Sequence, residues 1–148
     1  MSPVAGSIYT AHTTVTGGRE DGHGTSSDGQ LDVRLRLPRE MGGDGAGTNP
    51  EELFAIGYAA CFEGALGVVA RRERAELGEV SIDASVSLTP NSAKGFDLGV
   101  SLDVTLPGVT DPARASSIVS AAHQVCPYSN ATRGNVDVVL TANGRPLG

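Results

Sequence analysis

Cysteine is scarce in this sequence, positively charged residues are outnumbered, and long uncharged apolar runs are missing. The 148 residues include two cysteines, and 11 lysines and arginines stand against 17 aspartates and glutamates, for a formal net charge of −6. This negative balance makes nucleic acids and anionic membrane surfaces poor partners. No segment reaches the roughly 18 uncharged apolar residues that a membrane-spanning helix needs. The rest of the composition, with 39% hydrophobic and 19% charged residues, is that of an ordinary soluble globular protein.

The first residues also lack the pattern of a secretion signal. The stretch MSPVAGSIYTAHTT contains neither a basic region nor a long apolar region. We therefore expect a cytoplasmic protein, in a compartment where thiols are normally kept reduced. Cytosolic cysteine pairs that do form a bond are more often catalytic or redox-sensing than structural.

The sequence shows no pattern for a metal or a nucleotide cofactor. Its three histidines, His12, His23 and His123, are scattered, and its cysteines form no CxxC pair, so zinc-ligand spacing is lacking. The glycine-rich segment 41–50 has neither the Lys-Ser or Lys-Thr ending of a phosphate-binding loop nor the GxGxxG spacing. We interpret this segment as a flexible connector and expect no bound cofactor.

Hydrophobic periodicity predicts one domain over residues 1–148 with an α+β fold. Alternating or β-rich segments predict strands at 8–15, 31–37, 80–88, 96–106 and 135–142, and a capped apolar stripe predicts a helix at 111–126. In the third and fourth of these strands, the alternating sets that run from Val80 to Leu88 and from Phe96 to Leu106 are expected to face the core. Hairpin signals before the second strand and between the third and fourth favour largely antiparallel pairing.

The clearest helix signal covers residues 48–76. Asn49 is a good N-cap, Pro50 suits the first helical position, and Glu52 completes a capping box. The capping pattern assigns Glu52 to the helix end and gives Glu51 no part in it.

The same helix is apolar nearly all round. Across residues 53–70 the only charged residue is Glu63. A helix of this kind is buried on nearly all sides, and one layer of sheet cannot cover it, so we expect it to meet a partner chain. Four large apolar side chains around Cys61 are candidates to line a substrate pocket: Phe54, Ile56, Phe62 and Leu66.

Cys61 lies in the apolar part of this helix, and its surroundings decide whether it reacts. A thiol buried among apolar groups has a raised pKa and is inert, so a small core residue is the default interpretation. A nucleophilic thiol needs a nearby cation. The arginines at 71, 72 and 74 lie about 15 Å or more of helical rise away. Arg19, by contrast, follows two glycines that let the backbone turn toward other parts of the fold.

Cys126 has a different setting, directly before Pro127 at the end of the second expected helix. A helix C-terminus disfavours a thiolate, so Cys126 fits a thiol that attacks an oxidised Cys61. His123, three residues earlier, is either a base for Cys126 or a half-exposed helix residue. The residue patterns leave three classes open: a cysteine-based enzyme, a non-enzymatic redox sensor or binding protein, and a structural domain with inert cysteines.

Four stretches of the sequence resemble the OsmC/Ohr family, and in particular its organic hydroperoxide resistance branch. They stand in the family's order and read YTAHTTVTGGREDG, SSDGQLDVRLRLP, GGDGAGTNPEELFAIGYAACFEGAL and VCPYSNATRGNVDVVL. The resemblance runs nearly the whole length of the chain, and the last two stretches are long and specific.

The resemblance implies an activity, a site and an assembly. It implies a thiol peroxidase for organic hydroperoxides, including those of fatty acids, that is recycled by dihydrolipoyl groups or a lipoylated protein. Matched by position, Cys61 is the peroxidatic thiol and Cys126 the resolving thiol, while Arg19 is the catalytic arginine and Glu51 its carboxylate partner. It also implies an intertwined homodimer with a mostly antiparallel sheet, a long central helix and active sites at the subunit interface.

The spacing of two of these residues leads to a further hypothesis. Glu51 and Cys61 are ten residues apart on one expected helix, which corresponds to about 15 Å of rise. An arginine that pairs with Glu51 cannot easily reach Cys61 of the same chain. We therefore expect Arg19 and Glu51 to come from one subunit and both thiols to come from the other.

Overall fold

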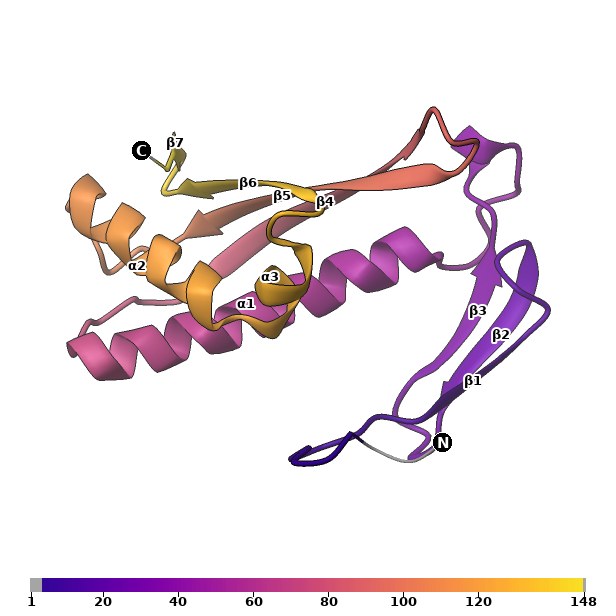
Figure 1. The fold of residues 1–148 in the computed structure, drawn as a ribbon, viewed down its shortest axis with the longest axis horizontal. Helices are drawn as coiled ribbons and strands as arrows, with labels where there is room; N and C mark the ends of the chain where they lie inside the picture. Colours follow the sequence, from indigo (N-terminus) through magenta and orange to yellow (C-terminus); the bar gives the residue numbers. More distant parts are fainter. Residues whose placement is uncertain (1–3, 148) are drawn as a thin grey trace. The chain divides into compact units, whose positions relative to one another are not determined.

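The computed structural model describes residues 4–147 and has a mixed α+β architecture with two sheets (Figure 1). The chain divides into two compact units, Met1–Pro50 and Glu51–Gly148. Each unit has a sheet of its own, and the long helix begins at the boundary between them. The expectation that residues 1–148 form one domain stays a prediction.

Unit 1 is built on a three-stranded antiparallel sheet. Its strands are β1 Thr13–Thr16, β2 Asp21–Ser26 and β3 Asp32–Arg36, in that order across the sheet, followed by the short 3-10 helix η1 Arg39–Met41. The pairing sets Val15 opposite Gly24 and Gly24 opposite Val33. All four residues of β1 are exposed in the chain, and Leu35 of β3 is the unit's buried apolar side chain among the described residues.

Ion pairs at the surface of unit 1 connect its sheet to the glycine-rich segment. The Arg36 guanidinium forms a fork on the Asp44 carboxylate, with Nε–Oδ1 and Nη2–Oδ2 distances of 3.1 and 2.5 Å. Its Nη1 also lies 2.7 Å from Asp21 Oδ1. The backbone N–H of Ala46 donates to Asp44 as well. Segment 41–50, which the sequence predicted to be a flexible connector, is instead held to the sheet by a fork geometry that suits arginine and carboxylate.

Unit 2 has a four-stranded sheet with one face turned to the core. Its strands are β4 Ser81–Pro90, β5 Phe96–Thr105, β6 Asp137–Ala142 and β7 Arg145–Pro146, in the spatial order β4-β5-β6-β7. β5 runs antiparallel to β4 and parallel to β6. The register places Val86, Val100 and Val138 side by side on the core face. The opposite face carries polar residues such as Ser85, Ser101 and Asp103.

Three helices complete unit 2: α1 Pro50–Glu73, α2 Pro112–Val125 and α3 Pro127–Thr132. Because β5 and β6 are parallel, the chain must cross from one end of the sheet to the other between them. Helices α2 and α3 make this crossover (Figure 1). Cys126 is the cap residue that joins them. Asp111 caps α2, as expected, and its carboxylate accepts the N–H of Ala113 at 3.2 Å.

The main differences from the sequence predictions are one shortened strand, four missed elements and one misplaced side chain. The predicted strand at 8–15 overlaps β1 only at residues 13–15, and β2, η1, α3 and β7 were not predicted. β2 reads DGHGTS, which has few β-forming residues, and it is held by pairing on both sides. Phe96 was expected in the core, but it is 65% exposed at the hairpin end of β5.

Helix α1 is buried along one side only. Its buried residues are Tyr58, Phe62, Ala65, Leu66 and Val69, at the spacing of a single helix face. By length and composition α1 could also cross a membrane, and only 28% of its most apolar window is buried within the chain. The five buried residues nevertheless all belong to the core cluster of unit 2. We conclude that α1 is a core helix whose other side, with Ile56 at 71% exposure, is uncovered in the single chain.

Candidate active site

The two thiols meet in unit 2. Cys61, in the middle of α1, and Cys126, at the α2–α3 joint, are both free cysteines. Their sulfur atoms are 3.5 Å apart, and the Cys126 thiol is oriented to donate to the sulfur of Cys61. A disulfide requires roughly 2.0 Å, so a small movement suffices to join them. This contact brings together residues 65 positions apart in the chain.

The exposure of the two cysteines is the reverse of what their sequence settings suggested. Cys126, beside a proline, is 0% exposed and belongs to the core cluster, whereas Cys61, inside an apolar run, is only half-buried. Cys126 lies at the joint between α2 and α3 and belongs to the core cluster, whereas Cys61 is not among the buried residues on the core-facing side of α1. A molecule arriving from solvent therefore reaches Cys61 first.

The environment of Cys61 within unit 2 keeps its thiol protonated. Burial is the largest effect and raises the pKa of Cys61. The backbone N–H of Tyr128 donates to the Cys61 sulfur and acts in the opposite direction, because it stabilises the thiolate. The net pKa is raised, so an additional positive group is needed to make Cys61 a thiolate at neutral pH.

The Tyr128 donor was missed from the sequence, although a signal for it existed. Pro127 was interpreted as the end of a helix, but proline also favours the first position of a new one. Cys126 is therefore both the C-cap of α2 and the N-cap of α3. The argument that a helix C-terminus disfavours a thiolate at Cys126 is incomplete, because a second helix begins at the same residue.

The structure places His123 with Ser129. The distance from His123 Nδ1 to Ser129 Oγ is 2.7 Å, so this nitrogen is engaged in a hydrogen bond. Burial, and then the positive charge of Arg133, lower the pKa of His123. A neutral, half-buried imidazole bonded to a serine favours the positional interpretation of His123 over that of a base for Cys126.

The structure places Arg19 in a turn between two strands and Glu51 in the first turn of a helix. Arg19 occupies the turn between β1 and β2, after Gly17 and Gly18, whose φ angles of 77° and 69° favour glycine. Its Nη2 lies 3.7 Å from the sulfur of Met41, in η1. Glu51 is half-buried in the first turn of α1. Arg19 belongs to unit 1 and Glu51 to unit 2, and their predicted roles remain predictions.

An apolar cavity adjoins the thiols through Tyr128. It has a volume of about 520 Å³ and its lining includes Phe54, Leu98, Tyr128 and Val136. Three of the chain's six phenylalanines and tyrosines gather here, because the rings of Phe54 and Tyr58 lie 5.8 and 5.5 Å from that of Tyr128. A side chain at position 57 would meet the Tyr128 hydroxyl at 2.8 Å, so Gly57 makes room for this ring.

The prediction of which residues line a substrate pocket is only partly correct. Phe54 does line the apolar cavity. Phe62 and Leu66 are 0% exposed and pack in the core, so they do not line an open pocket in the chain. Ile56 points to the uncovered side of α1, at 71% exposure. Periodicity identified these residues as apolar, but not the side of the helix on which each lies.

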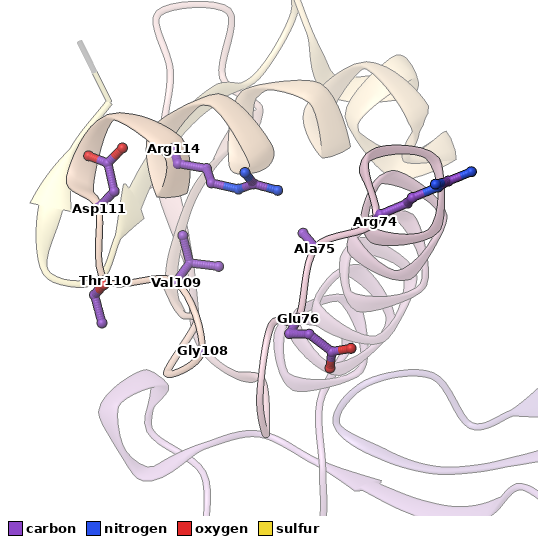
Figure 2. A pocket seen from close by; sticks show the side chains of 8 residues that line it. All are labelled: Arg74, Ala75, Glu76, Gly108, Val109, Thr110, Asp111 and Arg114. Atoms are coloured by element: carbon purple, nitrogen blue, oxygen red, sulfur yellow. The ribbon is translucent and has the colours of Figure 1, made fainter.

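A second cavity, of about 230 Å³, lies at the far end of α1 (Figure 2). Charged residues of both signs line it, among them Arg74, Glu76, Asp111 and Arg114. Figure 2 shows the Arg114 side chain reaching toward Ala75, while Arg74 and Asp111 point away. Helix α1 ends twelve residues after Cys61, about 18 Å of rise, so this cavity is not part of the thiol site. Within residues 4–147, no three His, Cys, Asp or Glu side chains are grouped to hold a metal ion.

The chain is similar to known proteins over most of its length. Residues 42–141 match the family described as OsmC-like protein. The organic hydroperoxide resistance protein of Xanthomonas axonopodis pv. citri is 57% identical over 136 residues, 90% of this chain and 94% of that protein. The crystal structure of the organic hydroperoxide resistance protein OhrB of Bacillus subtilis is 48% identical, with a TM-score of 0.81 and coverage of 90% and 98%.

A further crystal structure extends the likeness over a similar share of the fold. The organic hydroperoxide resistance protein from Elizabethkingia anophelis is 44% identical, with a TM-score of 0.86, over 92% of this chain and 96% of that one. Sequence and fold thus agree along nearly the whole chain, including the segments that carry both cysteines. This chain belongs to the OsmC-like family, within its organic hydroperoxide resistance branch.

Proposed function

We propose that this protein is a cysteine-based peroxidase that reduces organic hydroperoxides, including those of fatty acids, to alcohols. The observation that carries the proposal is the 3.5 Å approach of a half-exposed thiol, Cys61, to a fully buried one, Cys126. Relatives named for organic hydroperoxide resistance support the choice of substrate class. An inert structural pair would not need one of its sulfurs to be accessible.

The chemistry proceeds in three balanced steps. The Cys61 thiolate attacks an oxygen of the peroxide, the O–O bond breaks, and the alkoxide that leaves takes up a proton to become the alcohol. Cys61, oxidised by two electrons, is then a sulfenic acid. The Cys126 thiol attacks it, an S–S bond forms, and water leaves. An external dithiol reopens the disulfide by exchange and is itself oxidised.

Arg19 and Glu51 are proposed to activate the first step. The pKa of Cys61 is raised by burial, and a guanidinium beside the sulfur would lower it and stabilise the charge that develops on the leaving oxygen. A carboxylate that holds the guanidinium in a fork geometry would orient it. Two glycines before Arg19 allow its turn the required freedom.

We further propose a homodimer in which each site is shared. Helix α1 carries both Glu51 and Cys61, and their ten-residue separation is about 15 Å of rise. The uncovered side of α1, with Ile56 71% exposed, is the kind of apolar surface that a second copy would bury. In this arrangement Arg19 and Glu51 come from one subunit and the two thiols from the other.

The apolar cavity supports organic hydroperoxides over hydrogen peroxide. It is lined by Phe54, Leu98 and Tyr128, and burial of an alkyl chain contributes about 0.8 kcal/mol per methylene group. Hydrogen peroxide has no alkyl group and gains nothing from such a surface. We propose a cytoplasmic setting, no bound cofactor, and a dithiol reductant such as dihydrolipoyl groups, free or on a lipoylated protein.

The direct test is peroxide-dependent oxidation of a dithiol by the purified protein. We expect multiple turnovers with dihydrolipoamide and either cumene hydroperoxide or a fatty-acid hydroperoxide, and much lower efficiency with hydrogen peroxide. Equal efficiency for all peroxides would contradict the apolar pocket. Slow oxidation without turnover would instead favour a non-enzymatic redox sensor.

The shared site has its own test. Arg19→Ala and Cys61→Ser chains carrying different tags are co-expressed, and the heterodimer is purified through both tags. Each homodimer should be nearly inactive, whereas the heterodimer should regain up to half of the wild-type activity, since one of its two sites is intact. A heterodimer as inactive as its parents would refute the shared site and leave the peroxidase proposal standing.

A further inference from the structure

Behind the thiols lies a group of polar side chains that the activity proposed above does not use. The Tyr58 hydroxyl is 2.8 Å from Ser129 Oγ and 3.0 Å from Thr132 Oγ1, and His123 Nδ1 is 2.7 Å from the same Ser129 oxygen. Tyr58 and Ser129 are 0% exposed and Thr132 is 4% exposed. We call these four residues the hydroxyl cluster. The three hydroxyl-bearing residues lie in an otherwise apolar core, and His123, which bonds to one of them, is half-buried.

The hydroxyl cluster is not needed to fill space. A phenylalanine at position 58 has nearly the volume of tyrosine, and replacing hydrogen-bonded partners by apolar groups of the same shape is often nearly neutral for stability. Buried polar networks do, however, impose one geometry on the elements they join, because every alternative leaves a donor or acceptor unpaired. The hydroxyl cluster is therefore expected to fix the relative position of the helices that it joins.

The position it sets is that of α3 and its first residues. Tyr58 comes from α1, His123 from the last turn of α2, and Ser129 and Thr132 from α3, so the cluster joins all three helices. Along α1, Tyr58 lies three residues before Cys61, on the same side of the helix. Two groups of contacts to α1 thus lie one helical turn apart. The first group is made by Tyr58, with Ser129 and Thr132. The second is made by Cys61, whose sulfur contacts the Tyr128 N–H and the Cys126 thiol.

We propose that Tyr58 and Ser129, with His123, are positioning residues for the thiol pair. By holding α3 against α1, they keep the Tyr128 N–H on the Cys61 sulfur and the Cys126 sulfur within reach of it. Loss of this hold leaves both thiols present but less often in bonding geometry. The cluster matters for the proposed peroxidase because slow disulfide formation exposes the Cys61 sulfenic acid to a second peroxide, which converts it to sulfinic acid.

Tyr58→Phe is the central variant, and its chain should fold. Without the tyrosine hydroxyl, Ser129 Oγ keeps His123 as a partner, and Thr132 keeps its bond to the Ser129 carbonyl at 3.3 Å. Equilibration with glutathione buffers measures the tendency of the pair to form a disulfide, without any peroxide. We expect the equilibrium constant for disulfide formation to fall at least about fivefold, since the effective concentration of one thiol at the other is lowered.

Two further readouts separate positioning from general loss of stability. In a Cys126→Ser background, the pH profile of Cys61 alkylation should move to higher pH in Tyr58→Phe, because the N–H donor is no longer aligned. Ile118→Val is the control, since Ile118 is equally buried in α2 and the loss of one methylene group there lowers stability without touching the cluster. Ile118→Val should leave both readouts unchanged, and equal shifts in the two variants would overturn the proposal.

The peroxide experiment connects the cluster to catalysis. Excess cumene hydroperoxide without reductant should yield several-fold more Cys61 sulfinic acid in Tyr58→Phe and Ser129→Ala than in the wild type, as measured by mass spectrometry. The double variant should be no worse than the worse single one, because both residues act through the same contact. Unchanged glutathione equilibrium and alkylation profile in Tyr58→Phe would refute the positioning role. Failure of the wild type to react with any hydroperoxide would refute the peroxidase, and the glutathione arm would still decide the role of the cluster.

Discussion

The two units of this protein hold their candidate functional residues in different ways. In unit 2 Cys126 is buried in the continuous apolar core, and Cys61 packs against that core as a half-buried residue. In unit 1 the turn that carries Arg19 is next to Asp21, which pairs with Arg36 at the surface, and Arg36 in turn holds Asp44. Packing in the core therefore positions the two sulfur atoms, whereas ion pairs at the surface stabilise the turn that carries Arg19.

The difference has a physical consequence for how each region responds to change. Interactions between exposed charges are weakened by salt and by the mobility of long side chains. Buried packing and buried hydrogen bonds are insensitive to salt, but the removal of one atom group leaves a cavity or an unpaired partner. The stability of unit 2 should thus be sensitive to mutations in its core, and that of unit 1 should be sensitive to ionic strength.

The largest expected effect is at the sulfurs, where the two cysteines should behave unequally. Cys61→Ser should abolish peroxidase turnover, because no other thiol is accessible to attack the peroxide. Cys126→Ser should still allow one oxidation, after which Cys61 proceeds to sulfinic acid in excess hydroperoxide. Mass spectrometry of each variant after peroxide treatment makes the distinction. Sulfenic acid on Cys126 rather than on Cys61 would reverse the assignment.

The next effect compares the two units by one apolar truncation in each. Phe62→Ala, at a fully buried site of unit 2, should lower the free energy of unfolding by about 3–5 kcal/mol. Val15→Ala, at a β1 residue that is 56% exposed, should change it by no more than about 0.5 kcal/mol. Urea denaturation of both variants measures these values. A large loss for Val15→Ala would mean that β1 is covered in the assembled protein.

A smaller effect on the peroxidase rate is expected when an ion pair of unit 1 is removed by mutation. The Arg36 guanidinium holds the pKa of Asp44 down at about 2, so this carboxylate is charged throughout the neutral range. Asp44→Asn weakens the fork and should lower the peroxidase rate several-fold, because the Arg19 turn loses part of its brace. The matched control is Asp32→Asn, which removes the exposed pair with His23 at 2.5 Å in the same sheet.

Salt provides the second half of this test. The wild-type rate should fall as ionic strength rises, and the Asp44→Asn rate should depend on salt less, since the interaction that salt weakens is already reduced. The Asp32→Asn variant should follow the wild-type curve. Identical salt curves for all three proteins would show that the fork does not influence Arg19.

The smallest effect is a pH dependence of stability from His123. Burial and Arg133 lower the pKa of His123 in the folded protein, below the value of about 6.5 expected when unfolded. As the pH falls below about 6.5, the unfolded chain binds protons more readily than the folded one, so the free energy of unfolding decreases. His123→Asn can keep a hydrogen bond to Ser129 but cannot titrate. Its urea-denaturation midpoint should therefore decline less between pH 7 and pH 5 than that of the wild type, and parallel declines would contradict this origin.

Much of the fold was predictable from local patterns. The position of α1 followed from the Asn-Pro start and the apolar run, and α2 from its Asp-Pro start. Strands β4 and β5 followed from clean alternation, and their hairpin register, with Pro90 opposite Phe96, agrees with the predicted turn. β2 was missed because two of its six residues are glycines, and α3 was missed because it begins at a proline. Only pairing or packing with distant segments makes these two elements regular.

The sequence by itself indicated the candidates for the chemistry: two cysteines of unequal setting, an arginine after two glycines, and a family pattern around all of them. Only the tertiary structure decided that the sulfurs lie 3.5 Å apart, that Cys126 rather than Cys61 is fully buried, and that Tyr128 turns its N–H to the Cys61 sulfur. The physical reason is that burial and hydrogen bonding at Cys126 depend on a crossover that brings α2 and α3 back against α1. Periodicity describes the face of one helix, and it contains no information on which distant helix will cover that face.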